Sequence, residues 1–579
     1  MKSLFTLLFA ITVSFAMAQS LSFPPLDTNY RATEIRIANN LKMDVVFEGG
    51  RDAVWNGSAY GVAKTWNDFT GLVPLGTGND SCLLIVNHEL RLAARNPILG
   101  DGGGMTVFRV NKNATTGRWA VAPYNGHKYW QVDFKPVRGT YTNCGGITLP
   151  QAGRFMTAEE VTPANNLEIS GNFSDTSDFT IPSGPFKGNT YKAYLNYGWM
   201  VAVDAPNAKA LYKSYAMGRA PWEGGWAAPD GKTVYLNIDN TPAPFIRFVA
   251  DTVGNYEYGQ LQAYKQGANG IGGTWMDLPR SWDSVVNVQT VALKRGATMF
   301  TRLEWAVGNG NKLYVAETGN DATSYKAGQN LGGVPSWHFQ RLDTLGGLQR
   351  DTAFNDYYGR VLEFDMTTNT MRPFVEGGVG KTFTFSNPDG LSLHKQDGKT
   401  FLLIAEDVNG TSQKRSGGWN IPYCEAFLLD LNIANPTLND LRPFVAGPAD
   451  AELTGSVSTP DGKTIFINSQ HPYLLNSSAQ SNGSRNIPPF NNDATVAITG
   501  FSLTTPTNEV KISEGFSIYP NPASDVLNFN KTTDVSIYNI SGQQVRIERN
   551  VNQINVSDLN SGIYFLQTIQ GEVVKLVKQ

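Results

Sequence analysis

The chain has 579 residues, of which 17% are charged, and its formal net charge is −3. This balance gives no reason to expect nucleic acid or an anionic membrane surface as a partner. The length exceeds that of one ordinary domain, and 58 glycines with 30 prolines indicate a turn-rich β protein rather than a helical bundle. Any acidic site must therefore be a local feature of the fold.

The first eighteen residues have the features of a secretory signal peptide. Lys2 precedes an apolar run, and Ala16-Met17-Ala18 has the small-residue spacing of a cleavage site before Gln19. No later stretch approaches the roughly 20 apolar residues of a membrane-spanning helix. We therefore expect residues 1–18 to be removed, and we expect a protein without an integral membrane span that passes through the periplasm to the cell surface or the medium.

A hairpin unit with a carboxylate at each end recurs along the chain. In its clearest copy, Glu223 leads into an apolar-aromatic run, a turn at Asp230-Gly231 follows, and an alternating strand ends at Asp239. Asp-Gly between two such runs is a strong signal for a type I′ hairpin, whose two central residues both need positive φ. An antiparallel hairpin with nearly equal arms would return Glu223 and Asp239 to the same end.

Similar units lie elsewhere in the chain. Their leading and closing polar residues are Glu304 and Glu317, Asp389 with Glu406 and Asp407, Glu452 and His471, and, in a partial copy after a turn at residues 78–80, Asn87-His88-Glu89. Repeated units of this kind are typical of a β-propeller. A single acid beside a strand is more often a solvated turn residue. The repetition nevertheless predicts that one set of acids surrounds one end of a central channel, namely Glu89, Glu223, Glu304, Asp389 and Glu452.

The three cysteines, Cys82, Cys144 and Cys424, are too few for a disulfide scaffold. Cys82 and Cys424 stand beside apolar runs, so we expect both to be core residues. Cys144 lies in the glycine-rich segment Gly139–Gly146, with Glu159-Glu160 shortly after it. Two interpretations of Cys144 remain open: a buried inert thiol, or a thiolate ligand for a transition metal among carboxylates that otherwise suit calcium.

Several motifs together resemble those of a known family. They are VNHE at Val86–Glu89, GTYTNCGG at Gly139–Gly146, AEE at Ala158–Glu160, MGR with WE at Met217–Glu223, TRLE at Thr301–Glu304, NPDG at Asn387–Gly390 and PDGKTIFINSQHP at Pro460–Pro472. With these motifs in this order, the chain resembles the PhoX-type alkaline phosphatases, which are secreted, calcium- and iron-dependent phosphomonoesterases built on a β-propeller. The resemblance implies an all-β fold with a six-bladed propeller over residues 19–503, and hydrolysis of small-molecule phosphate esters.

The resemblance also implies which residues form the site. Carried over position by position, it implies a mixed iron–calcium cluster whose ligands are Glu89, Cys144, Glu223, Glu304 and Asp389. Arg302 would bind the phosphate and would act in catalysis together with Glu304 and Cys144. A polycationic cluster would neutralise the charge that makes a phosphate ester resist nucleophiles, and Arg302 would add a bidentate guanidinium.

Three positions depart from the family pattern. Trp222 stands where the family usually has histidine, residues 148–153 continue the cysteine motif differently, and Gly390 replaces a residue with a side-chain amide. Such neighbouring groups tune metal affinity and activity. They leave three alternatives open: a phosphodiesterase with the same cluster, a calcium-dependent lactonase-like hydrolase that needs only oxygen ligands, and a non-catalytic binding propeller.

The composition changes after the propeller. Residues 504–514 read as a polar linker, and residues 515–579 contain short alternating strands that predict a small β-sandwich. Through YPNP, SIYNISGQ and GIYFLQ, this tail resembles the type A C-terminal sorting domain of Bacteroidetes type IX secretion. The resemblance implies the type IX secretion machinery as a partner. The alternative, a small carbohydrate-binding module, lacks a tryptophan to stack on sugar. We expect the protein to be a monomer.

Overall fold

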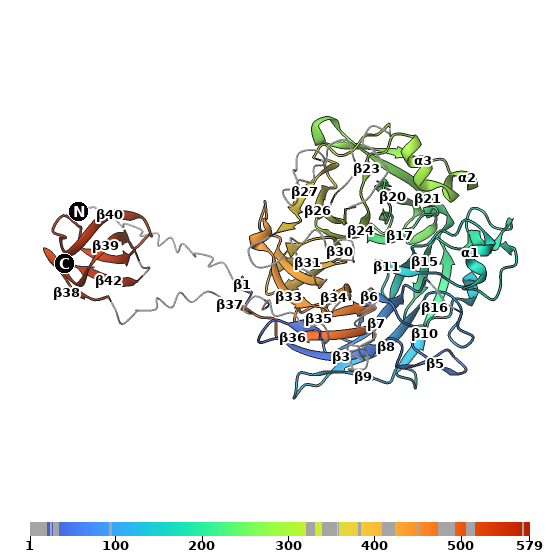
Figure 1. Ribbon diagram of the computed structural model, residues 1–579, viewed down its shortest axis with the longest axis horizontal. Coiled ribbons are helices and arrows are strands. Elements are labelled where there is room, and N and C mark those ends of the chain that lie inside the picture. The colour runs from blue at the N-terminus through green and yellow to red at the C-terminus, as the bar shows by residue number, and fades with distance from the viewer. Residues whose placement is uncertain are drawn as a thin grey trace, which may run out of the picture. The chain divides into compact units, whose positions relative to one another are not determined.

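In the computed structural model, six β-sheets of four or more strands surround one axis within residues 21–503 (Figure 1). The structure describes residues 20–21, 23, 26, 34–91, 95–319, 331–337, 356, 358–379, 384–407, 423–448, 451–472, 492–504, 516–569 and 572–579. The expected signal peptide and nearly all of the expected linker lie outside these ranges. The boundaries given above for them stay predictions.

We number the sheets as blades 1 to 6 in chain order and give the strands of each from the axis outward. Blade 1 contains β6 (Asn67–Pro74), β7 (Ser81–His88), β8 (Gly104–Lys112) and β10 (Tyr129–Gln131), with β9 (Trp119–Ala122), β4 (Ala53–Trp55) and β5 (Tyr60–Val62) on its outer side. Blade 2 contains β11 (Asn143–Thr148), β12 (Arg154–Glu159), β15 (Met200–Asp204) and β16 (Lys209–Lys213). Blade 3 contains β17 (Trp222–Ala227), β18 (Thr233–Ile238), β20 (Ile246–Thr252), β21 (Asn255–Gln266) and β22 (Gly273–Asp277).

The remaining blades follow the same plan. Blade 4 contains β24 (Leu303–Asn309), β25 (Lys312–Glu317), β26 (Arg360–Asp365) and β27 (Thr370–Glu376). Blade 5 contains β30 (Pro388–Gln396), β31 (Lys399–Glu406), β32 (Glu425–Asp430), β33 (Arg442–Ala446) and β2 (Arg36–Ile37). Blade 6 contains β34 (Glu452–Ser458), β35 (Thr464–Gln470), β36 (Ala494–Thr499) and β3 (Lys42–Glu48).

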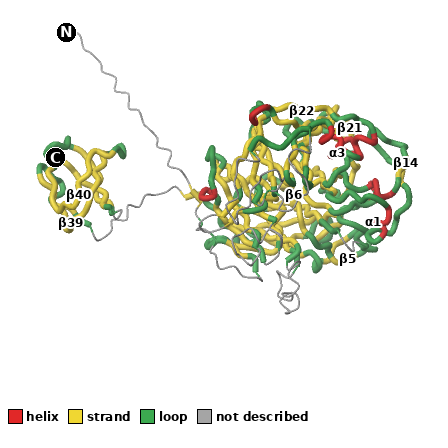
Figure 2. The backbone as a smooth tube through the Cα atoms, turned by 45° about the horizontal axis from the view of Figure 1, so that its top comes forward, coloured by secondary structure: helices red, strands yellow, loops and turns green. Residues whose placement is uncertain are grey.

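Shorter elements lie between or outside the blades. They are the strand pairs β1 (Ser20–Leu21) with β37 (Leu503–Thr504), β13 (Phe179–Thr180) with β14 (Thr190–Tyr191), β19 (Ala243–Pro244) with β23 (Met299–Phe300) and β28 (Gly378–Val379) with β29 (Thr384–Phe385), and the helices α1 (Asn166–Ser170), α2 (Trp282–Val286) and α3 (Val288–Lys294). Figure 2 shows these helices at the edge of a unit that consists mainly of strands. None of the described helices has the length and apolar character that crossing a membrane requires.

The innermost strands form a closed ring. Each of β6, β11, β17, β24 and β30 contacts the next, and β34 contacts both β30 and β6. Strand β3, from the start of the chain, pairs antiparallel with β36 and completes blade 6. This arrangement confirms the predicted six-bladed propeller.

Packing between blades explains the burial of the strands. Most inner strands are buried on both faces because each blade lies between two others, so burial does not alternate along them. All seven residues of β35 are buried, for example. Side chains such as Leu236 and Phe248 belong to a core that spans several neighbouring blades.

The repeated hairpin units are the two inner strands of the blades. At Asp397-Gly398 both residues have positive φ, 48° and 81°, and Gln396 pairs directly with Lys399, as a type I′ turn requires. At Asp230-Gly231 only the glycine has positive φ, so the type I′ prediction is wrong there. Asp230 Oδ1 accepts the N–H groups of Lys232 and Thr233, which stabilises a longer loop that contains the glycine.

The C-terminal unit, which includes Thr504–Gln579, is a separate β domain, as predicted. Its strands are β38 (Ile518–Tyr519), β39 (Val526–Asn539), β40 (Gln544–Asn555), β41 (Gly562–Thr568) and β42 (Val573–Lys578). Strand β39 pairs with β38, β40 and β41, and its register shifts at several bulges. Because bulges bend a strand, one hydrogen-bonded sheet can enclose its own small core.

Candidate metal centre

The innermost strand of each of five blades opens on a β-bulge. The register shifts directly after the first paired residue of β6, β11, β17, β24 and β30. A bulge leaves its extra residue outside the ladder and re-aims the side chain. The residues at the start of these bulges are, in blade order, Asp68, Cys144, Glu223, Glu304 and Asp389.

Blade 6 departs from this pattern. Its register shifts after the pair Thr454↔Asn468, which places Gly455 at the equivalent position. Gly455 has a φ of +60°, and a Cβ there would lie 2.1 Å from the backbone oxygen of Asp68. Blade 6 therefore contributes backbone at the position where the other blades contribute a donor side chain.

A second set of residues directly follows the second strand of each blade. In blade order these closing residues are Glu89, Glu160, Asp239, Thr318, Asp407 and His471. Antiparallel pairing returns them beside the bulge residues, which confirms that each hairpin gathers polar groups at one end. We call the acids and the thiol of both sets, with Glu452 at the start of β34, the donor crown; its members are Asp68, Glu89, Cys144, Glu160, Glu223, Asp239, Glu304, Asp389, Asp407 and Glu452.

Seven crown residues form three overlapping groups of potential metal ligands. The groups are Asp68–Glu89–Cys144, Cys144–Glu160–Glu223 and Glu223–Asp239–Glu304, and within each the ligand atoms lie within 4.8 Å of one another. Each group combines the bulge residue of one blade, its closing residue and the bulge residue of the next blade. Cys144 and Glu223 are each shared by two groups, and the Cys144 thiol donates to Glu223 Oε1 at 2.8 Å.

The structure thus brings the predicted ligands Glu89, Cys144, Glu223 and Glu304 together. Asp389 also belongs here, because its negative charge is among those that raise the pKa of Glu223. Glu452 stands close enough for Asp407 and Asp389 to raise its pKa as well, after burial. Their role as metal ligands stays a prediction.

Glu317 is a correction to the sequence interpretation. It was expected to close the hairpin of blade 4, but Thr318 has that position. Glu317 instead accepts the backbone N–H of Thr301 at 3.1 Å and pairs with Arg360 at 2.6 Å. Successive strand residues point to opposite faces, so a displacement of one residue takes a side chain from the axis into the blade.

Sequence reasoning did not assign Asp68, Glu160 or Asp239 to the site. Asp68 is the leading carboxylate of the partial copy, and the signal for it in the sequence is its position 12 residues ahead of Asp80 in the turn. Cys144 and Glu160 open and close the hairpin of blade 2, whose turn lacks the Asp-Gly signature. Asp239 had been recognised as the end of a hairpin only.

Burial and mutual repulsion control the protonation of the crown. Burial first, and then the charge of Glu89, raises the pKa of Asp68 to about 7. Burial and neighbouring carboxylates likewise raise the pKa of Glu223 and of Asp389 well above the usual range. The pKa of the Cys144 thiol is also raised, by burial and then by Asp68. So many acids can ionise together only if cations compensate them.

The donor set fits a group of cations. Among the described residues, Asp68 Oδ2, Asp389 Oδ1 and Glu304 Oε2 are buried without a hydrogen-bond partner, and Glu304 Oε1 has only an ion pair with Arg302. Buried polar atoms normally have partners. Hard carboxylate oxygens suit calcium, and a thiolate adds the softer ligand that favours a transition metal. The residues present therefore match a mixed set of metal ions.

Two arginines lie at the crown. Arg302 Nε donates to Asp239 at 2.6 Å, and its Nη2 pairs with Glu304 at 3.1 Å. Arg91 donates from Nε to Glu89 at 2.7 Å and from Nη2 to Glu160 at 2.7 Å and 2.5 Å. Although burial opposes it, Asp239 and Glu304 raise the pKa of Arg302, so this guanidinium is always charged.

Residues with positive φ precede four of the innermost strands. Trp66, Thr142, Arg302 and Asn387 have φ values of 61°, 45°, 51° and 53°, and each stands one residue before its strand. This conformation is uncommon outside glycine and is an outlier for the β-branched Thr142. Strain of this kind persists where surrounding contacts impose it, often at functional sites.

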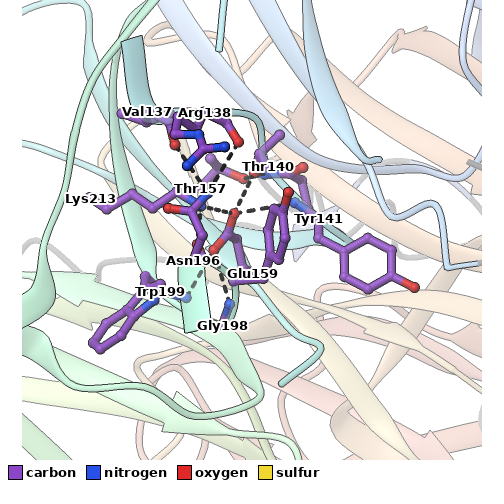
Figure 3. A network of polar contacts seen from close by, with 12 residues as sticks. Val137, Arg138, Thr140, Tyr141, Thr157, Glu159, Asn196, Gly198, Trp199 and Lys213 are labelled. Atoms are coloured by element: carbon purple, nitrogen blue, oxygen red, sulfur yellow. Dashed lines mark hydrogen bonds and ion pairs between the residues drawn. The ribbon is translucent and has the colours of Figure 1, made fainter. Parts of the chain in front are cut away.

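A buried carboxylate imposes the loop conformation in blade 2 (Figure 3). Glu159 Oε1 accepts from Thr140 Oγ1 at 2.9 Å and from the Tyr141 N–H at 3.2 Å, and Lys213 Nζ donates to it at 2.8 Å. Its Oε2 accepts the N–H groups of residues 198 and 199. Glu159 thereby fixes the loop that leads to Cys144.

In blades 4 and 5, a buried carboxylate also binds the loop that precedes the innermost strand. Glu317 accepts the N–H of Thr301, and Glu406 accepts the N–H of Ser386 at 2.8 Å. As with Tyr141 in blade 2, each N–H belongs to the residue two positions before the innermost strand. These carboxylates position the ligand-bearing loops without belonging to the crown.

Asparagines fix the bulges themselves. Asn87 Nδ2 donates to the backbone oxygen of Cys144 at 2.5 Å, and Asn237 Nδ2 donates to that of Glu304 at 2.5 Å. Asn468 Nδ2 donates to the backbone oxygen of Asp68. In each case, the second strand of one blade holds a bulge residue of another blade, so blade packing controls the position of the donor side chains.

Other residues noted in the sequence serve the core. Trp222 is fully buried and donates to the Gly218 backbone oxygen at 2.9 Å, so the position where the family has histidine is structural in this chain. Cys82 and Cys424 are buried, as expected. A separate cavity of about 410 Å³, lined by residues such as Lys64 and Arg138, contains no member of the crown.

Comparison with protein families identifies the chain. A sequence model described as alkaline phosphatase PhoX matches residues 23–473. The chain belongs to the PhoX family of alkaline phosphatases. This confirms the resemblance seen in its motifs and makes the protein a phosphoric ester hydrolase. A second model, described as a secretion system C-terminal sorting domain, matches residues 517–579, so the tail implies secretion.

A solved structure supports the fold. The structure of Pseudomonas fluorescens PhoX in complex with vanadate, a transition state analogue, is similar with a TM-score of 0.60 and 19% identity over 83% of this chain and 98% of that chain. Trypanosoma rangeli sialidase in complex with sialic acid has a TM-score of 0.33 at 9% identity, over 93% of this chain and 74% of that chain. A Xanthomonas campestris gluconolactonase has a TM-score of 0.28 at 11% identity, over 79% of this chain and 99% of that chain. The last two carry no inference. A comparison with curated proteins finds no match.

Proposed function

We propose that this PhoX-family phosphatase is a secreted phosphomonoesterase whose donor crown holds iron and calcium. The observation that supports this most is the sharing of Cys144 and Glu223 between adjacent donor groups. Shared ligands suit several cations in one cluster. The thiol supplies the soft ligand for iron, and the carboxylates supply the oxygen ligands for calcium.

Within this proposal the ligands are Glu89, Cys144, Glu223, Glu304 and Asp389, together with Asp68, Glu160 and Asp239. When bound, the cations supply positive charge for the phosphoryl oxygens and lower the pKa of a bound water. The proton that Cys144 donates to Glu223 leaves when a cation binds, which couples metal uptake to proton release.

Arg302 binds the phosphoryl group in this scheme. Its Nε and Nη2 are engaged by Asp239 and Glu304, while Nη1 has no hydrogen bond within the described residues. A guanidinium held in this way is oriented before substrate arrives, which reduces the entropy lost on binding. The strained φ of 51° at Arg302 is consistent with that role.

A first experiment combines elemental analysis with hydrolysis of a generic aryl phosphate. We expect the purified protein to contain iron and calcium, and we expect EDTA to abolish phosphate release. Calcium alone would favour the lactonase-like alternative, and absence of stoichiometric metal would favour a binding propeller. Comparing an aryl phosphate with a bis(aryl) phosphate separates the monoesterase from a diesterase.

A matched pair of variants assigns the thiol. Cys144→Ala should lose iron and at least a hundredfold in kcat/KM, because metal ligands of this kind dominate affinity. Cys82→Ala removes another buried thiol, at the end of β7 that is remote from Glu89, and should keep the full metal content. Equal metal content in both variants would contradict the role proposed for Cys144.

A further inference from the structure

Arg91 contacts the crown in the same manner as Arg302. It stands three residues after β7, and its Nε and Nη2 bind Glu89 and Glu160. Arg302 binds Asp239 and Glu304 through the same two nitrogens. Within the described residues, Nη1 of each guanidinium has no hydrogen bond and can donate to a further anionic oxygen.

The two arginines flank the three donor groups. Arg91 contacts residues of blades 1 and 2, whereas Arg302 contacts residues of blades 3 and 4. Glu160, which Arg91 contacts, and Asp239, which Arg302 contacts, each have a ligand atom within 4.8 Å of one on Glu223. The two guanidiniums therefore border the two donor groups that share Glu223.

Both arginines are partly exposed, whereas most of the carboxylates that they bind are buried. The side chain of Arg91 is 46% exposed and that of Arg302 is 21% exposed, although the carboxylates Glu89 and Glu304 are buried. In the structural pair between Lys213 and Glu159, both side chains are 0% exposed (Figure 3). The guanidinium of Arg91 thus covers buried acids on one side and reaches solvent on the other.

We propose that Arg91 is a second phosphate-binding residue, which holds the ester from the blade 1 and 2 side while Arg302 holds it from the blade 3 and 4 side. The pair selects dianionic phosphate monoesters over singly charged diesters. This inference rests on the proposed function. A monoester above its second pKa near 6 carries two charges on three terminal oxygens, which suits two guanidinium groups that each offer Nη1. A diester offers one charge and two such oxygens.

The test measures the binding of inorganic phosphate to the metal-loaded full-length protein, with metal content and hydrolysis recorded in parallel. Arg91→Gln should weaken phosphate binding about tenfold or more, the effect of losing a charged hydrogen bond, with metal content unchanged. Arg91→Lys keeps the charge but loses the fork, so it should bind with intermediate affinity. The ratio of monoester to diester kcat/KM should fall in Arg91→Gln.

Two reference variants make the outcome decisive. Arg118→Gln removes another half-exposed arginine that pairs with a buried acid, Asp44, outside the crown, and should leave phosphate binding unchanged. Arg302→Gln should weaken phosphate binding. If Arg302→Gln weakens it and Arg91→Gln does not, the inference fails and the proposed function stands.

Two further results are also distinguishable. Loss of metal from Arg91→Gln would overturn the inference, because Arg91 would then serve only to hold the ligands. If the wild-type protein neither binds phosphate nor hydrolyses the ester, the proposed function fails and the inference fails with it.

Discussion

Burial determines the chemistry of the individual crown residues. Asp68, Glu223 and Asp389 have raised pKa values because they lose hydration and face other carboxylates. In the metal-free protein, bound protons therefore neutralise these carboxylates, as cations would in the metal-loaded protein. Metal uptake by these residues requires that the protons leave.

This competition predicts how the stability of the metal-free protein depends on pH. Carboxylates titrate near pH 4 in the unfolded chain, whereas the pKa of folded Asp68 is about 7. Between these values the folded state binds more protons than the unfolded state, so the free energy of unfolding falls as pH rises. Urea titrations of EDTA-treated protein between pH 4 and pH 7 should show this loss of stability.

The metal-loaded protein provides the control for the pH experiment. Cations compensate the carboxylates without protons, so the decline should be much smaller across the same range. A metal-free protein whose free energy of unfolding stayed constant or rose with pH would contradict the electrostatic picture of the crown.

The inner hairpin of each blade is the element that carries function. In blades 1, 2, 3 and 5 its first strand presents one donor on a bulge, and another donor directly follows its second strand. Glu159, Glu317 or Glu406 fixes the entering loop in blades 2, 4 and 5. The loop and the donor are therefore separable in mutagenesis.

Variants of the Glu159 network test that separation. Thr140→Val removes one hydrogen bond to Glu159 and should lower the free energy of unfolding by about 1–2 kcal/mol while weakening metal binding at Cys144. Glu159→Gln leaves the buried Lys213 without its counter-charge and should cost about 3–5 kcal/mol. Chemical denaturation and metal titration measure the two effects.

An exposed threonine pair supplies the control. Thr190→Val removes the hydrogen bond between Thr180 and Thr190 on the short β13–β14 hairpin and should leave metal affinity unchanged. If Thr140→Val also left metal affinity unchanged, Glu159 would have only a structural role.

Much of this element could be predicted from the sequence. Hairpins with acids at both ends identified Glu89, Glu223, Glu304 and Asp389, because strand alternation and Asp-Gly turns are local signals. The bulges cannot be recognised in the sequence. For this reason Glu317, and not Thr318, is the residue that the sequence predicts at the end of the blade 4 hairpin. Blade 2 was not recognised as a repeat, because a cysteine opens it and its turn has no Asp-Gly pair.

At the scale of the whole molecule, the crown belongs entirely to one unit. All ten of its residues lie within Leu21–Leu503, and the sorting domain lies beyond it. The propeller should therefore keep its metal content and kcat/KM when residues 505–579 are deleted. Elemental analysis and steady-state kinetics of the truncated protein check this expectation.

Removal of β3 is the contrasting deletion. Without residues 42–48, blade 6 loses its outermost strand and exposes the edge of β36. We expect that protein to lose metal binding and to aggregate. If it kept both solubility and metal, β3 would not be needed to close the ring.

The pairing of β3 with β36 also dictates when the centre can first exist. Strand β3, near residue 45, pairs with β36, near residue 497. Blade 6 can therefore form only after almost the whole propeller sequence has been synthesised. Contacts of such large sequence separation form slowly. Blade 6 also holds the Asp68 bulge through Asn468. We therefore expect full affinity for cations only after the ring has closed, so that metal binding would follow the last step of folding.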